Sequence, residues 1–306
     1  MCGILGIYNL NGAPIDKNSL VEMGNQINHR GPDGEGHFVQ ANLGLVHKRL
    51  AILDPTDKGQ QPMHSKDRKW VIVFNGCIYN FKQLREELIQ KGHTFQTETD
   101  TEVICEGLSA FGTTFLERFN GMFAIGAWNR EEKKLYLSRD RYGIKPLYYW
   151  FNKDTLVFAS EIKAIIKHPN YQMDVDLDAL NEYFTIQNIF SYNTLFKGVN
   201  MLPPANTVEV NHDTKFVKHN SWWDYDFSKT DNTMSFEYAK EQTKELFEQA
   251  VTKQMVSDVP VGTYLSGGMD SGSITSVANK HIDRLSTFTC GFDTVSYTHL
   301  TLPTKA

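Results

Sequence analysis

The sequence predicts two domains of different class: an α+β domain of sheets covered by helices on their outer faces, then the first part of an α/β domain with a parallel sheet. Short apolar strands dominate residues 4–202, where only two strong helix patterns occur. After residue 233 the order becomes helix, strand, glycine turn, helix and strand, which is typical of the start of an α/β nucleotide-binding sheet. Turn residues and aromatic residues separate the two regions.

The composition is that of a globular protein with room for two domains. The 306 residues are 41% hydrophobic and 22% charged, with a formal net charge of -5. This charge, with Lys and Arg scattered among acids, argues against a nucleic-acid partner. No segment approaches the length of a membrane span, and no signal-like stretch opens the chain, so we expect no membrane partner. The cysteines are far apart and lack CxxC spacing, which argues against disulfides or zinc and favours the cytoplasm: Cys2, Cys77, Cys105 and Cys290.

The elements of the first domain follow from periodicity. Its strands are expected, in order, at ILGIYNL, LGLVH, WVIVFN, MFAIGAWN, KLYLSRD and LVFAS. A first helix is expected at 81–92, with an apolar stripe of Leu84, Leu88 and Ile89. A second is expected at 100–112, with Val103, Ile104, Leu108 and Phe111 on one face. A glycine, Gly92 or Gly112, ends each helix.

The second domain opens with an amphipathic helix. Apolar residues in 235–256 fall close to helical spacing, with Ser235 as the N-cap. VPVGTYL and LSTFTCGF are expected strands, and SITSVANK is a helix. We therefore expect a first domain at 1–205, a linker at 206–232 and a second domain at 233–294.

The turn SGGMDSG carries the chemistry of the second domain. Gly267 and Gly268 remove side chains where a strand leads into a helix, so backbone N–H groups can close on a phosphate. Ser266 and Ser271 add hydroxyl donors, and Asp270 could help to hold Mg²⁺. The turn is not a P-loop, because it has no GK[ST] ending. A tight turn without a ligand is the alternative; the serines and the aspartate favour phosphate binding.

Cys2 directly follows the initiator methionine. If Met1 is removed, the thiol and a free α-amine share one residue, and the amine, with a pKa of about 8, can act as a general base. Nucleophile and base would then come from Cys2 alone. The alternative is a small buried residue at the start of a strand, and position alone does not decide between the two.

Eight motifs in order carry a family resemblance. They are MCGILGI, HRGPDGEGHF, HKRLAILD, VFNGCIYN, TETDTEVI, FNGMFAIGAWN, RDRYGIKPLYY and FASEIKAI. They resemble the glutaminase domain of class II glutamine amidotransferases, and with SGGMDSG the chain resembles glutamine-dependent asparagine synthetases, from Met1 to about Thr294. Other class II amidotransferases carry sugar-isomerase or phosphoribosyltransferase domains instead, which that turn argues against.

The resemblance implies an N-terminal nucleophile hydrolase fold, an αββα sandwich, with Cys2 as nucleophile and its amine as proton shuttle. Asn75, through its side-chain amide, and Gly76, through its N–H, match the oxyanion-hole pair. Arg49 matches the residue that binds the α-carboxylate of glutamine, and Asp100 matches the acceptor for its α-amino group. Without the family pattern, Arg49 and Asp100 would be interpreted as solvated surface charges.

The second domain of this family is an ATP pyrophosphatase, so the resemblance implies a ligase that uses ATP and Mg²⁺. It forms an acyl-adenylate of an acceptor carboxylate, commonly aspartate, and receives ammonia through a tunnel. Ser266, Gly267, Gly268, Asp270 and Ser271 match its pyrophosphate loop. Relatives amidate sugar acids or peptide precursors or close β-lactam rings, so the acceptor stays open. A homodimer is compatible with the sequence, which does not determine the oligomeric state.

The chain departs from the family pattern at three positions. Cys77 stands where a glutamate commonly lies beside the glutamine α-amino group, so one anchoring charge is missing. Gly272 replaces the last serine of the loop and removes a hydroxyl. Ala205 replaces a glycine after LPP, and nothing explains that change.

The last twelve residues, VSYTHLTLPTKA, resemble a translated sequencing-library adapter more than a protein continuation. We therefore expect residues 295–306 to be non-native and the second domain to be truncated, with an unpaired sheet edge and low stability. Three functions stay open: a fragment of an asparagine-synthetase-like ligase, a glutaminase alone, or a non-catalytic module.

Overall fold

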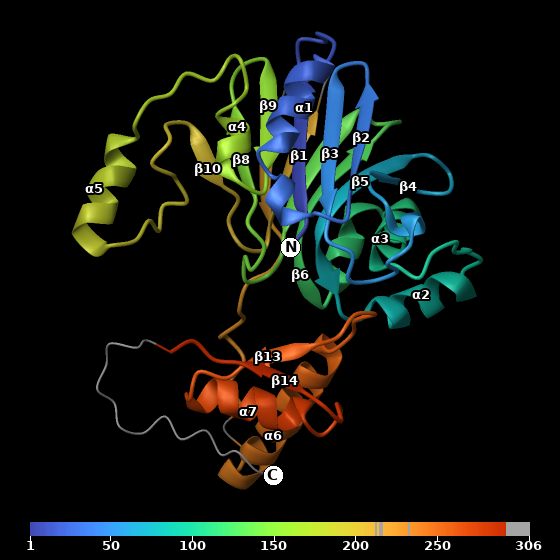
Figure 1. Ribbon diagram of the computed structural model, residues 1–306, viewed down its shortest axis with the longest axis vertical. Helices are drawn as coiled ribbons and strands as arrows, with labels where there is room; N and C mark the ends of the chain where they lie inside the picture. The colour runs from blue at the N-terminus through green and yellow to red at the C-terminus, as the bar shows by residue number, and fades with distance from the viewer. Residues whose placement is uncertain (212, 214–216, 232, 292–306) are drawn as a thin grey trace. The chain divides into compact units, whose positions relative to one another are not determined.

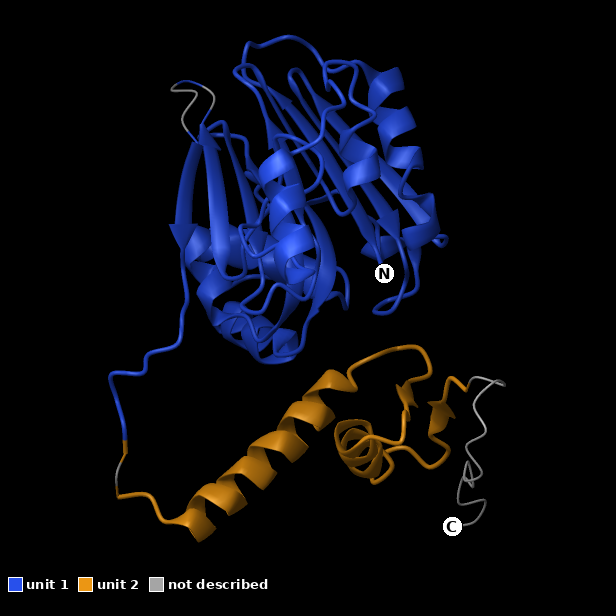
Figure 2. Cartoon of the chain, turned by 90° about the vertical axis from the view of Figure 1, so that its left-hand side faces the viewer, with its two compact units in different colours: residues 1–230 blue, residues 231–306 orange. Residues whose placement is uncertain are grey.

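The computed structural model describes residues 1–211, 213, 217–231 and 233–291, and it divides the chain into two compact units, residues 1–230 and 231–306 (Figure 1, Figure 2). The tail predicted at 295–306 lies outside the described residues.

The first unit contains most of the secondary structure. Its strands are β1 (Gly3–Asn9), β2 (Gly34–Gln40), β3 (Leu43–Arg49), β4 (Met63–His64), β5 (Trp70–Ile78), β6 (Gly121–Asn129), β7 (Lys134–Arg139), β8 (Tyr148–Phe151), β9 (Thr155–Ala159), β10 (Val199–Met201), β11 (Asn206–Asn211) and β12 (Val217–Ser221). Its helices are α1 (Lys17–Asn25), α2 (Phe81–Gln90), α3 (Asp100–Phe111), α4 (Ile162–Ile165) and α5 (Leu177–Ile186), with 3-10 turns η1 (Asn28–Arg30), η2 (Asp57–Gly59) and η3 (Gly112–Arg118).

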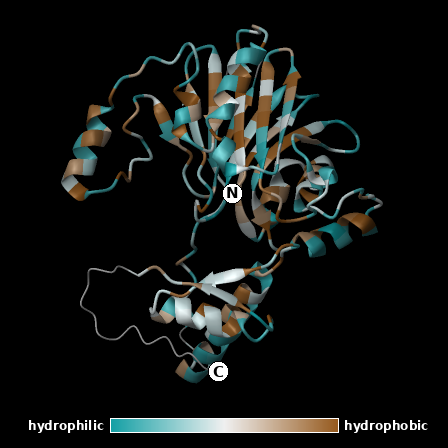
Figure 3. Cartoon of the chain, viewed as in Figure 1, coloured by the Kyte–Doolittle hydropathy of each residue, from teal (hydrophilic) through white to brown (hydrophobic). Residues whose placement is uncertain are grey.

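The strands of the first unit form two antiparallel sheets of six strands each. One sheet has the order β10-β8-β9-β1-β3-β2, and the other has the order β12-β11-β7-β6-β5-β4. In the first sheet Leu5 of β1 pairs with Val46 of β3. In the second sheet Asn75 of β5 pairs with Ala124 of β6. Hydrophobic residues are frequent along these strands (Figure 3).

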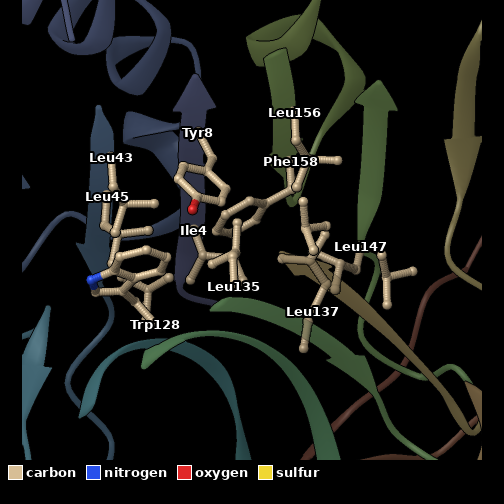
Figure 4. Packing of buried hydrophobic residues seen from close by; sticks show 14 of the residues in the cluster. Ile4, Tyr8, Leu43, Leu45, Trp128, Leu135, Leu137, Leu147, Leu156 and Phe158 are labelled. Carbon is tan, nitrogen blue, oxygen red and sulfur yellow. The ribbon is translucent and has the colours of Figure 1, made fainter. Parts of the chain in front are cut away.

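The main core lies between the two sheets. Figure 4 shows Ile4, Tyr8, Leu43, Leu45 and Phe158 of the first sheet facing Trp128, Leu135 and Leu137 of the second. The Phe158 ring lies against Gly6 of β1 in the first sheet and Gly126 of β6 in the second, where a side chain would collide with it. A Cβ on Gly6 would lie 2.1 Å from this ring, and a Cβ on Gly126 would lie 2.5 Å from it. These two glycines therefore let the sheets approach closely.

Helices cover both outer faces, which confirms the predicted αββα sandwich. Leu20 and Met23 of α1, with Ala164 and Ile165 of α4, form a second core with the outer face of the β1 sheet. On the other side α3 packs on β5 and β4, and α2 packs on α3. The two helices predicted at 81–92 and 100–112 are α2 and α3, and Gly112 ends α3 with a positive φ of 65°.

Some elements were not predicted. Helix α1 has a short and mainly polar sequence with only three buried residues, and α5 leaves most of its apolar side chains in solvent. Strands β11 and β12 lie within the stretch that we expected to be a linker, residues 206–232. Strand β11 instead extends the second sheet beside β7, because the alternating sequence buries Val208 and Val210.

The second unit contains α6 (Phe236–Gln254), β13 (Gly262–Tyr264), α7 (Met269–Ala278) and β14 (Ser286–Phe288). Ser235 caps α6 as predicted, since its hydroxyl accepts the Tyr238 N–H at 3.3 Å. Strands β13 and β14 form a parallel pair. Among the described residues of this unit only Val277 and Ala278 are buried, so its core is small. No helix in the described part of the chain is long and apolar enough to cross a membrane.

Candidate active site

Cys2 is held firmly at the entry to β1. Its Sγ lies 3.3 Å from the Leu50 N–H and 3.5 Å from the Leu50 carbonyl oxygen, so the thiol can accept from one and donate to the other. The Arg30 Nε donates to the Cys2 carbonyl oxygen at 2.9 Å, and an Arg30 terminal nitrogen donates to Glu161 at 2.9 Å. The cysteine is therefore fixed by Leu50, which directly follows β3, and by Arg30 of η1, within the HRGPDG motif, and is not a frayed terminus.

A cavity of about 240 Å³ opens beside the Cys2 thiol. All five residues that the sequence predicts for the first site line it: Cys2, Arg49, Asn75, Gly76 and Asp100. They come from the start of β1, the end of β3, the end of β5 and the start of α3. Its size is below the usual range of roughly 300 to 1,000 Å³ for pockets of drug-sized ligands, and it suits a small molecule.

The Asn75 side chain offers a free donor at this cavity. Asn75 is 1% exposed, and among the described residues its Nδ2 has no hydrogen-bond partner. An amide N–H₂ buried without an acceptor is uncommon, because the lost hydrogen bonds to water are not replaced. The arrangement fits a group that receives its acceptor from a bound molecule.

The backbone of Gly76 adds a second donor. In a β-strand the N–H groups of adjacent residues point to opposite edges, so those of alternate residues point to the same edge. The Phe74 N–H donates to the Gln61 side chain at 2.7 Å, and the Ile78 N–H donates to Asp100 at 2.9 Å, both away from β6. Gly76 is two residues from both Phe74 and Ile78, so its N–H points to the same edge of β5, away from β6 and toward the cavity.

Gly76 also has to be a glycine for steric reasons. A Cβ at this position would lie 2.2 Å from the Met122 carbonyl oxygen and 2.7 Å from the Phe74 ring. Both contacts are shorter than side chains tolerate, so any larger residue would displace β5 from β6.

Arg49 is buried and organises the loop that walls the cavity. Its guanidinium donates to the carbonyl oxygens of Leu53 at 3.3 Å, of Thr56 at 2.6 Å and of Asp54. Gly59 makes room for it, since a Cβ there would lie 2.2 Å from an Arg49 nitrogen. The residue is 5% exposed, so it is not the solvated surface charge that its position alone would suggest.

Asp100 is a buried carboxylate at the start of α3. Its Oδ2 accepts the Ile78 N–H, and burial raises the pKa of Asp100 to about 6 although backbone hydrogen bonds act in the opposite direction. Above that pH the carboxylate is charged and can bind a cation in the cavity. Below it the site loses this negative charge.

Burial also sets the protonation of the two cavity thiols. It raises the pKa of the Cys2 thiol, while the Leu50 backbone and the N-terminal charge act in the opposite direction. Burial raises the pKa of Cys77 to about 12, so this thiol is neutral and supplies no charge to the cavity. Burial lowers the pKa of the Met1 α-amine, which is the N-terminus while Met1 is present. A nucleophile here needs a nearby base, and an α-amine on Cys2 itself, exposed by removal of Met1, can provide one.

Lys145 lines the same cavity, although sequence reasoning assigned it no role. It is 7% exposed, and its Nζ donates to the Met1 Sδ at 3.3 Å. The signal in the sequence was a lysine inside the apolar stretch GIKPLYY, within one of the motifs quoted above.

The glycine turn forms a separate candidate site in the second unit. Gly267 has a φ of 84°, which favours glycine, and Gly268 precedes α7 without a side-chain cap. The Ser271 hydroxyl accepts the Ser266 N–H at 3.2 Å, and the two hydroxyls lie 3.0 Å apart. The structure therefore brings the two predicted serines together at an uncapped helix N-terminus, a donor set that fits a phosphate group.

Asp270 is the acidic residue of this turn. It lies exposed in the first turn of α7, and the described residues contain no group of three or more His, Cys, Asp or Glu side chains that could hold a metal ion. A single carboxylate still fits Mg²⁺, because this ion commonly binds one or two carboxylates together with phosphate oxygens and water.

Two protein families match the chain. Residues 1–223 match the family described as glutamine amidotransferase domain, and residues 242–301 match the family described as asparagine synthase. Asparagine synthetase [glutamine-hydrolyzing] 1 of Bacillus subtilis (strain 168) is 37% identical over 96% of this chain and 46% of its own length. Asparagine synthetase [glutamine-hydrolyzing] of Zea mays is 33% identical over 92% of this chain and 43% of its own length. The chain thus spans about half the length of these curated relatives.

Solved structures support the fold. A glutamine phosphoribosylpyrophosphate amidotransferase from B. subtilis, complexed with ADP and GMP, matches with a TM-score of 0.53 at 18% identity. The match covers 94% of this chain and 65% of the amidotransferase chain. A structure described as the allosteric regulatory enzyme of purine biosynthesis matches with a TM-score of 0.54 at 16% identity. This match covers 99% of this chain and 68% of the enzyme's chain. At this identity the likeness concerns the fold alone.

Proposed function

The chain belongs to the family of glutamine amidotransferase domains, and on this basis we propose that its first unit hydrolyses the side-chain amide of glutamine to glutamate and ammonia. One observation carries the proposal. Asn75 Nδ2, which has no hydrogen-bond partner among the described residues, and the outward N–H of Gly76 lie in one cavity with the Cys2 thiol, where an oxyanion would need two donors.

The nucleophile and the base come from one residue in this proposal. Removal of Met1 leaves Cys2 with a free α-amine, which takes the thiol proton as sulfur attacks the amide carbon. The S–C bond forms, and the π electron pair of the carbonyl moves onto its oxygen. The Cys2 carbonyl oxygen is already fixed by Arg30, so the thiol and the amine keep a set orientation.

The tetrahedral oxyanion is bound by Asn75 Nδ2 and the Gly76 N–H. The C–N bond then breaks, and the proton held by the Cys2 amine passes to the leaving nitrogen, so ammonia departs and a thioester remains. Water, deprotonated by the same amine, attacks the thioester carbon; the S–C bond breaks, glutamate leaves and the thiol regains its proton.

Two charges of opposite sign recognise the amino-acid end of glutamine. Arg49 binds the α-carboxylate, since its guanidinium reaches the cavity wall, and Asp100 accepts the α-ammonium. Cys77 adds no charge, because its thiol is neutral. Asp100 is therefore the main anion for the α-ammonium, and binding depends on its ionisation.

Glutamate release tests this proposal. Chain with a verified Cys2 terminus should release glutamate from glutamine, Cys2→Ala should abolish release, and Cys105→Ala should retain it. Cys105 is the matched control because it is a fully buried thiol outside the cavity. Activity that survives in Cys2→Ala would overturn Cys2 as the nucleophile, and no activity in the wild type would leave only a non-catalytic role.

For the second unit we propose the nucleotide half of an asparagine-synthetase-like ligase. Ser266, Gly267, Gly268 and Ser271 would bind the phosphates of ATP, and Asp270 would help to hold Mg²⁺, whose charge would offset that of the phosphates. The whole protein would transfer glutamine nitrogen to a carboxylate activated by ATP, with aspartate as the acceptor. The family match at 242–301 and the named relatives support this proposal. We also propose a cytoplasmic location, in keeping with four free cysteines.

Equilibrium dialysis with ATP and Mg²⁺ tests the nucleotide site. Ser271→Ala should weaken binding, because it removes the hydroxyl that joins the two ends of the turn, whereas Ser273→Ala on the exposed side of α7 should not. A chain that hydrolyses glutamine but binds no ATP would be a glutaminase alone. If both functions are present, the amidated product identifies the acceptor, which would be aspartate or another acid.

A further inference from the structure

Lys145 is a buried cation with no carboxylate partner in the described part of the chain. Its backbone is fixed, because its N–H donates to Asp140 at 3.1 Å and its carbonyl oxygen accepts the Arg139 Nε at 2.8 Å. Among the described residues the contact found for its ammonium is the Met1 thioether at 3.3 Å. A buried ammonium normally needs an anion or several strong acceptors, and a thioether is a weak acceptor.

The ammonium lies at the reacting end of the cavity. Lys145 and Cys2 line the same cavity, and the contact with Met1 brings Lys145 to the residue that directly precedes the nucleophile. Removal of Met1, which the proposed function requires, takes away the thioether. The ammonium then shares the cavity with the new α-amine and the thiol of Cys2, the two groups whose charge changes during attack.

We propose that Lys145 is a positioning residue for the glutaminase reaction, whose fixed positive charge favours the neutral amine and the thiolate of Cys2. The inference rests on the proposed function of the first unit. Lys145 itself gains and loses no proton, since the thiol proton passes to the Cys2 amine. A like charge near the amine disfavours its protonation, and an opposite charge near sulfur favours the thiolate.

Other charges face the same groups. The titratable and charged groups acting on the terminus, on the Cys2 thiol and on Lys145 are the N-terminal amine, Arg30, Asp33, Arg49, Cys77, Asp100 and Asp140. Arg30 is already paired with Glu161, and Arg49 is bound to three backbone carbonyls. Lys145 has no such pairing, so its charge is the least neutralised of the three cations near Cys2.

Alkylation of Cys2 tests this proposal without glutamine. Chains with a verified Cys2 terminus are treated with iodoacetamide between pH 6 and 10, and the adduct is quantified on the N-terminal peptide by mass spectrometry. Alkylation requires the thiolate.

At pH values below the pKa of the Cys2 thiol, Lys145→Met and Lys145→Gln should react about tenfold more slowly than the wild type. This difference corresponds to a rise of about one unit in the pKa of that thiol. Lys145→Arg should restore the profile, and Lys197→Met, an exposed lysine outside the cavity, should leave it unchanged.

The pH profile of glutamate release gives a second readout. Loss of the Lys145 charge should move the acid limb, which reports the Cys2 amine, to higher pH, whereas a purely structural role would lower activity at every pH alike. Superimposable alkylation profiles for the wild type and a folded uncharged variant would overturn the proposal. If the wild type releases no glutamate but the alkylation profile shifts, the proposed function fails, and with it a role of Lys145 in that reaction, while the electrostatic effect of Lys145 on the Cys2 thiol is supported.

Discussion

Asp100 Oδ2 accepts the backbone N–H of Ile78 at 2.9 Å, so the first residue of α3 is tied to the edge of β5 two residues beyond Gly76. This bond joins the end of the cavity that we propose to recognise glutamine to the donors that we propose for an oxyanion. It also places a carboxylate where burial raises its pKa to about 6.

Glutamine binding should therefore weaken in mild acid. At pH 5 only about a tenth of Asp100 would be charged, so the KM for glutamine should rise about tenfold between pH 7 and pH 5. Steady-state kinetics of glutamate release across this range measure the effect. Asp100→Asn should have a high KM that changes little with pH, and a wild-type KM that is constant down to pH 5 would contradict the assignment.

The same carboxylate should lower stability at neutral pH. Its pKa is higher in the folded protein than its ordinary value of 3.8, so the folded state holds the proton more tightly and stability falls as pH rises through that window. Asp100→Asn should raise the free energy of unfolding at pH 7 by up to about 3 kcal/mol, since one pKa unit is about 1.4 kcal/mol. Urea unfolding at pH 7 and pH 4 measures this; the gain should be much smaller at pH 4, and a less stable variant at pH 7 would refute the prediction.

Asn75→Ala should reduce turnover rather than binding. The amide has no partner in the described structure, so its loss leaves the resting site intact and removes a donor used as charge develops on oxygen. We expect kcat to fall about a hundredfold or more, with KM changed by less than about threefold. Asn18→Ala, at an exposed position on α1, is the control. A rise in KM with unchanged kcat would place Asn75 in substrate binding instead.

Cys77→Glu should improve glutamine binding. The neutral thiol lines the cavity near Asp100, and a second carboxylate would add attraction for the α-ammonium. We expect KM to fall several-fold at pH 8, while Cys77→Gln, which adds similar bulk without charge, should not lower it. Equal effects of the two substitutions would show that size, rather than charge, controls this position.

The five residues predicted for the first site, which line one cavity in the structure, could be named from the sequence because they fall in motifs whose order matches a known family. Their convergence could not be seen from spacing: Cys2, Asn75 and Asp100 are far apart in the chain and meet only after two sheets stack and α3 packs on β5. Lys145 was missed because its burial depends on the turn fixed by Asp140, which no local pattern reveals.

The fold was predicted in outline for a similar reason. Alternating apolar strands and the two amphipathic helices α2 and α3 carry strong local signals. Strands β11 and β12 do not: β12 is an edge strand without a buried residue, and β11 beside it is only six residues long within a stretch rich in polar and turn residues that resembles a linker. Helix α1 is mostly polar and is stabilised by its Asp16 cap and by packing of Leu20 and Met23 on the sheet.

The most direct test of Cys2 as the nucleophile is the mass of the protein after reaction with 6-diazo-5-oxonorleucine, a glutamine analogue that carries a reactive diazoketone. Peptide mapping should place one adduct on Cys2, excess glutamine should slow its formation, and Cys2→Ala should remain unmodified. An adduct on Cys77 instead of Cys2, or a Cys2 adduct whose rate glutamine does not affect, would contradict the account of this site.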